Sequence, residues 1–162
     1  MSQEAPRIVI IGGGPAGYEA ATAGAKYGAH ITLVEDQGPG GSSVLLDCVP
    51  SKSFIAGANI QTDFRRADDM GLNNQLSSLK LNLQALNGRV QALAGNQSQD
   101  VRDGLEEIGV QVIDGRAAFS EDQNGVTGAA HRVDVTHNDG ATETLDADLV
   151  LVATGATPRI LP

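Results

Sequence analysis

Two short runs of apolar, mostly β-branched residues open the chain, and a segment with helical periodicity joins them. The first run, residues 7–11, ends in three glycines, and the second, residues 30–34, ends at Glu35. Continuous apolar runs of this length are typical of strands buried on both faces of a parallel sheet. Between them Pro15 suits a first helical turn, and small or apolar residues recur at helical spacing. The pattern predicts a right-handed unit of strand, helix and parallel strand.

The middle of the chain has a helical period. A helix is expected over residues 50–69, with Gly71 as its stop and four apolar residues on its packed side: Phe54, Ile55, Ala58 and Phe64. A second apolar stripe runs over residues 83–108 and is interrupted at residues 95–99. This stripe predicts either one long amphipathic helix that ends at Gly109 or two helices with a kink.

From Val110 onward the period changes to two. Alternation over residues 110–113, 132–136 and 142–145, with a turn at 138–140, predicts a small antiparallel meander. Residues 148–153 form another near-continuous apolar strand. The elements together predict an α/β fold with a βαβ unit, long helices and an inserted antiparallel β-meander.

The composition is that of a soluble globular protein. Of 162 residues, 41% are hydrophobic and 19% are charged, which is enough apolar surface to form a core. Lysine and arginine number 11 against 20 aspartates and glutamates, and the net charge of -9 argues against nucleic acid as a partner. The first apolar run is too short for a signal peptide or a membrane span. We therefore expect a cytoplasmic protein with no integral membrane contact.

Metal and disulfide chemistry have little support in the sequence. The single cysteine, Cys48, excludes an internal disulfide, a dithiol redox pair and a cysteine-based zinc finger. The histidines at positions 30, 131 and 137 are not spaced from carboxylates as metal ligands are. No metal site is expected.

A glycine motif follows the first predicted strand directly and opens the first predicted helix. Gly12 permits a sharp turn, Gly14 lets a pyrophosphate approach bare backbone, and Gly17 lets the helix pack closely on the strand. Glu35 ends the next strand, where an acidic residue accepts hydrogen bonds from the hydroxyls of an adenosine ribose. This arrangement predicts a dinucleotide site, and FAD and NAD share it.

The residues after the second predicted strand help to decide between FAD and NAD. Gly40 and Gly41 are followed by Ser43, Cys48 and the run Pro50-Ser51-Lys52. This segment resembles the signature of the FAD-dependent pyridine-nucleotide disulfide oxidoreductases, the family of dihydrolipoamide dehydrogenase and glutathione reductase. In that family a glycine pair precedes two cysteines separated by four residues, and here Ser43 occupies the first cysteine position.

Two further segments resemble the same family, and the matches run in family order along essentially the whole chain. Residues 114–117 resemble the stretch whose backbone meets the adenine ring, and residues 150–158 resemble the closing strand of the FAD domain with its Ala-Thr-Gly turn. The resemblance implies that residues 1–162 are a Rossmann-like N-terminal FAD-binding domain, incomplete and without the nicotinamide and interface domains. It implies FAD as cofactor, NAD(P)H as co-substrate and a homodimeric parent protein.

The residues expected to bind FAD combine the glycine motif with the positions carried over from the family. They are Gly12, Gly14, Pro15, Ala16, Gly17, Glu35, Asp36, Gly40, Gly41, Ser42, Ser43, Cys48, Lys52, Ala117, Ala153, Thr154 and Gly155. Because several flavin contacts belong to the absent part, we expect the 162 residues alone to bind FAD weakly or not at all.

Ser43 changes the expected chemistry. A serine hydroxyl cannot form a disulfide, so thiol–disulfide exchange is closed off and reduced flavin must pass its electrons elsewhere. The resemblance is closest to the branch of NAD(P)H:quinone oxidoreductases without the cysteine pair, and quinones accept electrons directly from a reduced flavin. The alternatives are a dinucleotide-binding fragment without catalysis and a dihydrolipoamide dehydrogenase-like enzyme.

Cys48 and Lys52 are the catalytic candidates near the flavin. Cys48 is interpreted either as a lone thiol beside the flavin or as a small buried residue, and the second interpretation is favoured because cysteine is among the most buried residue types. Lys52 resembles the family lysine beside the isoalloxazine ring, where a positive charge favours the reduced flavin. The alternative is a solvated lysine at a helix end.

Overall fold

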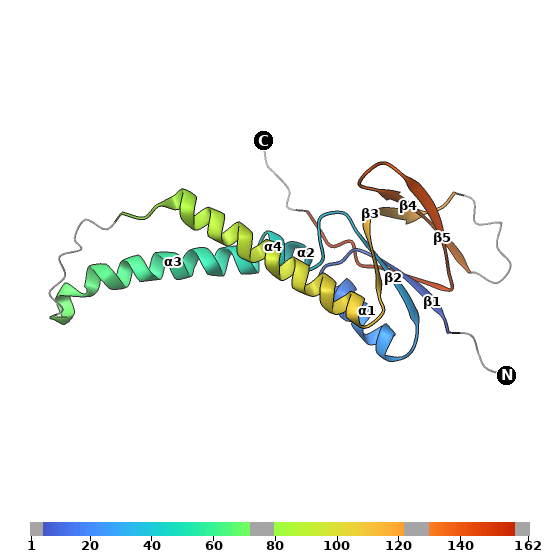
Figure 1. The fold of residues 1–162 in the computed structure, drawn as a ribbon, viewed down its shortest axis with the longest axis horizontal. Coiled ribbons are helices and arrows are strands. Elements are labelled where there is room, and N and C mark those ends of the chain that lie inside the picture. The colour runs from blue at the N-terminus through green and yellow to red at the C-terminus, as the bar shows by residue number, and fades with distance from the viewer. Residues whose placement is uncertain (1–4, 72–79, 122–129, 158–162) are drawn as a thin grey trace. The chain divides into compact units, whose positions relative to one another are not determined.

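The computed structural model describes residues 5–71, 80–121 and 130–157 (Figure 1). The chain divides into two compact units. The first consists of Met1–Gly41 and Ser98–Pro162, and the second of Ser42–Gln97. The mixed α/β fold agrees with the prediction, and each unit is described by itself below.

The first unit is built on a six-stranded sheet in the order β5-β4-β3-β2-β1-β6. Strand β1 is parallel to β2 and β6, and β2 is parallel to β3, whereas β3, β4 and β5 pair antiparallel. The elements are β1 (Arg7–Ile11), α1 (Pro15–Lys26), β2 (His30–Glu35), β3 (Gln111–Phe119), β4 (His131–His137), β5 (Thr142–Ala147) and β6 (Leu149–Val152). The predicted βαβ unit and the predicted meander are both present.

Strand β3 joins the parallel and antiparallel parts of the sheet. Its residues 111–114 pair with β2, and its residues 115–119 pair with β4. The sequence pattern assigned residues 110–113 to the antiparallel meander, but residues 111–114 pair parallel with β2 and the same strand continues into the meander. The meander is therefore an extension of the parallel sheet.

The two faces of β1 and β2 are buried against different partners. One face packs on α1 and on the end of α4 (Leu83–Glu107) through Ile10, Ala21, Leu33 and Leu105. The opposite face packs against the antiparallel strands through a second cluster, which contains Val9, Ile11, Val34, Ile113, Val133, Val135 and Ala147. Burial on both faces explains why these strands are continuous apolar runs instead of alternating ones.

An ion pair ties the start of β1 to the start of β6. The guanidinium of Arg7 donates through Nη2 to Oδ1 of Asp148 at 2.8 Å, and the backbone N–H of Arg7 donates to Oδ2 at 2.8 Å. These hydrogen bonds lower the pKa of Asp148 from 3.8 to about 2. The pair fixes the end of the sheet that lies opposite the glycine turn.

The second unit is helical. It contains α3 (Cys48–Arg66), the 3-10 turn η1 (Asp68–Met70), most of α2 (Gly41–Leu45) and the first part of α4. Helix α4 is continuous from Leu83 to Glu107, which decides between the two predicted alternatives in favour of one long helix. Helix α3 ends before the 3-10 turn, several residues ahead of the predicted stop at Gly71. Within the described ranges, no helix has the length and apolar character needed to cross a membrane.

The predicted packed side of α3 is wrong. Phe54, Ile55, Ala58 and Phe64 are all exposed, and no residue of α3 is buried. The contact with α4 runs instead along a side with small and polar residues, where a Cβ on Gly57 would lie 2.9 Å from Cδ1 of Leu86. The helix was predicted correctly because periodicity shows where apolar residues lie, but periodicity does not show which neighbour covers them.

Asp148→Asn is expected to lower the midpoint of thermal unfolding at about pH 7. Because the pKa of Asp148 is lower in the folded protein, its stabilising effect is complete above the unfolded value of 3.8 and is lost as pH falls toward about 2. The difference between variant and wild type should therefore shrink as the pH falls from about 4 toward about 2 in parallel thermal scans. Asp63→Asn, at an exposed position of α3, is the control. A difference that grows with acidification would contradict this role for Asp148.

Candidate functional site

The glycine turn between β1 and α1 is the centre of the candidate site. Gly12 has a φ of 105°, and a Cβ on it would overlap the carbonyl oxygen of Ala153. A Cβ on Gly17 would overlap the carbonyl oxygen of Gly12. Neither position has room for a side chain. The turn, the first turn of α1 and the segment after β6 therefore approach as bare backbone.

Gly14 differs from these two glycines because a Cβ on it would meet nothing within 4 Å. It is the N-cap of α1, and no side chain caps the helix there within the described residues. The first backbone N–H groups of a helix have no intrahelical acceptor and carry partial positive charge. Because Pro15, at the start of the helix, has no N–H, Ala16 and Gly17 supply the free N–H groups of this first turn. The geometry suits an anion.

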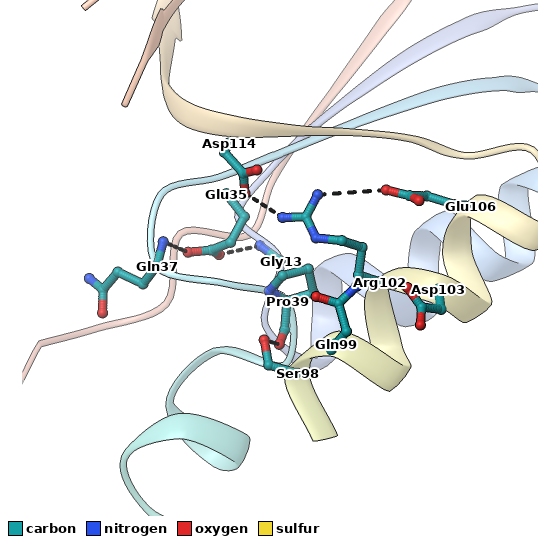
Figure 2. A network of polar contacts seen from close by, with 10 residues as sticks. All are labelled: Gly13, Glu35, Gln37, Pro39, Ser98, Gln99, Arg102, Asp103, Glu106 and Asp114. Carbon is teal, nitrogen blue, oxygen red and sulfur yellow. Dashed lines mark hydrogen bonds and ion pairs between the residues drawn. The ribbon is translucent and has the colours of Figure 1, made fainter. Parts of the chain in front are cut away.

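Glu35 lies at the end of β2, beside the glycine turn. Its Oε2 accepts a hydrogen bond from the N–H of Gly13 at 2.6 Å, and its Oε1 accepts one from the N–H of Gln37 at 2.9 Å (Figure 2). An ionised carboxylate has about four acceptor positions. Glu35 is therefore fixed by the backbone on both sides and keeps acceptor capacity for two further hydroxyl donors.

The loop after β2 folds back onto the glycine turn. The N–H of Gly40 donates to the carbonyl oxygen of Gly13 at 2.8 Å. A Cβ on Gly41 would lie 2.7 Å from Cα of Gly14, so here too two backbones are in direct contact. The structure thus brings the predicted residues Gly40 and Gly41 to the predicted glycine motif.

Asp36 continues from Glu35 and forms an ion pair across to β3. Nε of Arg116 donates to its Oδ2 at 2.7 Å, and the Arg116 side chain is 81% exposed. Both residues lie beyond the last register pair of β2 and β3, which is Glu35 with Asp114. The pair occupies the rim of the carboxyl end of the sheet.

The backbone of Ala117 points away from β4. The N–H of Asn138 donates to the carbonyl oxygen of Asp114, and the N–H of Ser120 donates to that of Arg132. Residues of an antiparallel strand alternate between those bonded to the partner and those whose N–H and C=O point to the other side. Ala117 falls in the second set. Since the ladder with β2 ends at Asp114, this edge is not paired by β2 in the described part of the chain.

The segment after β6 completes the candidate site of the first unit. The N–H of Ala153 donates to the carbonyl oxygen of Ile11 at 2.8 Å, which carries the β1–β6 ladder one step further. Thr154 and Gly155 follow directly and are exposed. The predicted residues from three separate parts of the first unit therefore meet around the glycine turn.

The remaining predicted residues belong to the second unit. Ser42 and Ser43 lie on α2, and the carbonyl oxygen of Ser42 accepts from the N–H of Asp47 at 2.7 Å. Cys48 and Lys52 lie in the first turns of α3, and both are exposed. The favoured interpretation of Cys48 as a buried residue is therefore wrong. That these four residues border a flavin stays a prediction.

Several contacts of the site were not predicted from the sequence. They are those of Gly13 and Gln37, which hold Glu35, of Arg116, which pairs with Asp36, and of Ser98, Arg102 and Asp114, which link α4 to the carboxyl end of the sheet. Backbone donors such as Gly13 carry no side-chain signal. Among the residues described, no group of three or more histidine, cysteine or acidic side chains could hold a metal ion.

Comparison with known proteins explains this arrangement. The profile of the family described as pyridine nucleotide-disulphide oxidoreductase matches residues 6–162. The chain belongs to this family. The crystal structure of LpdA from Mycobacterium tuberculosis superposes with a TM-score of 0.83 at 46% sequence identity, covering 97% of this chain and 33% of that chain. The Rossmann-like fold that the family resemblance implied is thus confirmed.

The curated relatives include proteins with two different names. A Mycobacterium tuberculosis protein named NAD(P)H dehydrogenase (quinone) is 46% identical over 159 residues, which cover 96% of this chain and 32% of the relative. Dihydrolipoyl dehydrogenases of Chlorobaculum tepidum and Bacillus subtilis are 33% and 29% identical over 155 residues, again 96% of this chain. They are covered over 31% and 32% of their lengths. The chain therefore spans about a third of the length of these relatives.

Two glycine substitutions should separate folding from the open space at α1. Gly17→Ala is expected to lower the free energy of unfolding by about 2 kcal/mol or more, because the added methyl group meets a fixed carbonyl. Gly14→Ala should cost no more than about 1 kcal/mol, because its φ of -67° suits alanine and the space is free. Urea unfolding followed by circular dichroism measures both. Equal losses for the two variants would argue against the close packing at Gly17.

Proposed function

We propose that the first unit binds the adenosine diphosphate half of FAD and that the whole protein is an FAD-dependent NAD(P)H oxidoreductase that reduces a quinone or a similar acceptor. Residues 1–162 are then its FAD-binding domain, lacking the nicotinamide and interface domains. The observation that carries the proposal is the combination of the open Gly14 beside the doubly held Glu35 with a serine at position 43.

The residues present fit a dinucleotide. A Cβ at Gly14 would extend into the space in front of α1, so that glycine keeps clear the position where a pyrophosphate would lie. The N–H groups of Ala16 and Gly17 would donate to it, and the positive end of the helix would stabilise its charge. Glu35 would accept from the two ribose hydroxyls with the acceptor positions that Gly13 and Gln37 leave unused.

Ala117 and the segment after β6 extend this binding site in two directions. The outward backbone of Ala117 offers one donor and one acceptor at the β3 edge, which matches the hydrogen-bonding edge of an adenine. Asp36 and its partner Arg116 would border the base. Thr154 and Gly155, together with Gly40 and Gly41, would lie against the pyrophosphate side.

The residues of the second unit are assigned to the flavin end. FAD, when bound, supplies hydride acceptance from NAD(P)H and electron donation to the acceptor. Lys52 would place a positive charge near the flavin and favour its reduced form, and Ser42, Ser43 and Cys48 would line the same side. Ser43 cannot form a disulfide with Cys48, so no electron passes through a thiol pair. A quinone accepts electrons directly from a reduced flavin and needs no thiol pair.

The relatives support quinone reduction over lipoamide reduction. The protein named NAD(P)H dehydrogenase (quinone) is 46% identical, whereas the dihydrolipoyl dehydrogenases are 29% to 33% identical. Lipoamide reduction needs the cysteine pair that Ser43 removes. For residues 1–162 alone we infer nucleotide binding without turnover, since they span about a third of these relatives.

The isolated 162 residues should bind FAD weakly, and more tightly than FMN. FMN lacks the adenosine diphosphate that Gly14, Glu35 and Ala117 would hold, so equal affinity for both flavins would contradict the proposal. Gly14→Ala should weaken FAD binding by about tenfold or more, the equivalent of one good hydrogen bond to the pyrophosphate, and leave FMN binding unchanged. Quenching of flavin fluorescence on titration with protein measures both affinities.

The whole protein should oxidise NAD(P)H with menadione and show only background turnover with lipoamide. The reason is that Ser43 leaves the flavin as the direct donor to the acceptor. Absorbance at the NAD(P)H band measures both reactions, and a dihydrolipoyl dehydrogenase with both cysteines is the positive control for lipoamide. Lipoamide turnover by the whole protein would sink the assignment, as would inactivity with several quinones.

A further inference from the structure

Helix α4 reaches the candidate site through a serine that the sequence pattern did not single out. Ser98 lies in line with three apolar residues of α4 that precede it at intervals of four: Leu86 is half-buried, and Val90 and Ala94 are buried. Its hydroxyl Oγ donates to the carbonyl oxygen of Pro39 at 2.7 Å (Figure 2). Pro39 is fully buried. A hydroxyl thus occupies a place where the rest of the stripe is apolar.

The acceptor of this hydrogen bond, Pro39, lies in the loop after β2, next to the residue that bonds to the glycine turn. Pro39 precedes Gly40, whose N–H donates to Gly13, and Gly13 donates to Glu35. The loop contains three glycines with positive φ, at positions 38, 40 and 41. Glycine gives such a loop many alternative conformations, so contacts from outside the loop matter for fixing it. The side chain of Ser98 supplies one such contact, at Pro39.

A second contact from α4 fixes the neighbouring strand. Arg102, one turn after Ser98, forms an ion pair with Asp114, and Asp114 is the register partner of Glu35 on β3 (Figure 2). Arg102 also pairs with Glu106 on its own helix at 3.6 Å. One face of α4 therefore holds both segments that flank Glu35.

We propose that Ser98 is a positioning residue of the nucleotide site, which holds residues 38–41 against the glycine turn through Pro39. This rests on the proposed binding of FAD by the first unit. Ser98 touches no part of the nucleotide in this assignment. It acts through the loop, which carries Gly40 and Gly41 to the pyrophosphate and keeps the N–H of Gly13 directed at Glu35.

The test compares three variants of the 162-residue chain. Ser98→Ala removes the hydroxyl, and Ser98→Thr keeps it. Gln99→Ala is the matched control, because it removes a side-chain hydrogen bond to Asp103 from the adjacent, exposed position of the same helix. Three quantities are measured for each: hydrogen exchange of the Gly40 amide, affinity for FAD and the midpoint of thermal unfolding.

For Ser98→Ala we expect Gly40 to exchange several-fold faster and FAD to bind more weakly, each on the order of 2- to 10-fold, the range of one hydrogen bond. Ser98→Thr should restore both values, and Gln99→Ala should change neither. Helix propensity favours alanine, so the thermal midpoint of Ser98→Ala should stay close to that of wild type. A loss of affinity without a matching loss of stability is what a positioning role requires.

Other results separate the two proposals. Unchanged exchange at Gly40 in Ser98→Ala would overturn the positioning role whatever happens to FAD. Faster exchange with unchanged FAD affinity would also overturn it, because the loop would then be held for folding alone. If wild type shows no preference for FAD over FMN while Gly40 responds to Ser98→Ala and recovers in Ser98→Thr, the proposed function fails and the hold of Ser98 on the loop stands.

Discussion

The first unit depends on a single constraint, the contact of bare backbone at the turn between β1 and α1. Gly12 lies against Ala153, Gly17 lies against Gly12, and Gly41 lies against Gly14. Each contact excludes a side chain, and together they set the distance between the sheet, the first helix and two loops. At Gly14, by contrast, a Cβ would meet nothing within 4 Å, and this glycine lies at the positive end of α1. The same absence of side chains therefore packs the turn and leaves space at the helix N-terminus.

Polar contacts from α4 complement this backbone contact. Apolar residues fix the end of the helix on the sheet, where Leu105 packs beside Leu33. Apolar packing sets a position but tolerates sliding, whereas a hydroxyl bonded to one carbonyl and a guanidinium bonded to one carboxylate do not. Ser98 and Arg102 supply these directional contacts at the two segments beside Glu35. Helix α4 thus serves the core at one turn and the candidate site at the next.

Sequence patterns predicted those parts of the site that depend on the type of residue at a position. The glycine motif and Glu35 were found because only glycine permits the close approaches and because the acid falls at the end of a strand. The contacts of Arg116 and Gly13 could not be predicted, since the pairing of an exposed arginine and the hydrogen bond of a backbone amide leave no pattern in the sequence. Ser98 did leave a signal. The apolar stripe of α4 is interrupted at residues 95–99, where a polar residue takes a position on its buried side. A serine at such a position needs a hydrogen-bond acceptor. The exposed apolar stripe of α3 shows the limit of sequence periodicity. A period locates the apolar residues of a helix but does not identify the surface that packs against them.

Under the proposed function, the residues assigned to the two ends of the cofactor belong to different units. The proposed contacts of the adenosine half come from backbone and from Glu35 in the first unit, whereas Ser43, Cys48 and Lys52 belong to the second. Replacing sulfur by oxygen at position 43 alters none of the contacts at the glycine turn. In the proposed function it removes one electron acceptor and would leave the flavin to donate directly. The family match covers both units, residues 6–162, whereas the proposed choice of acceptor depends on Ser43 in the second.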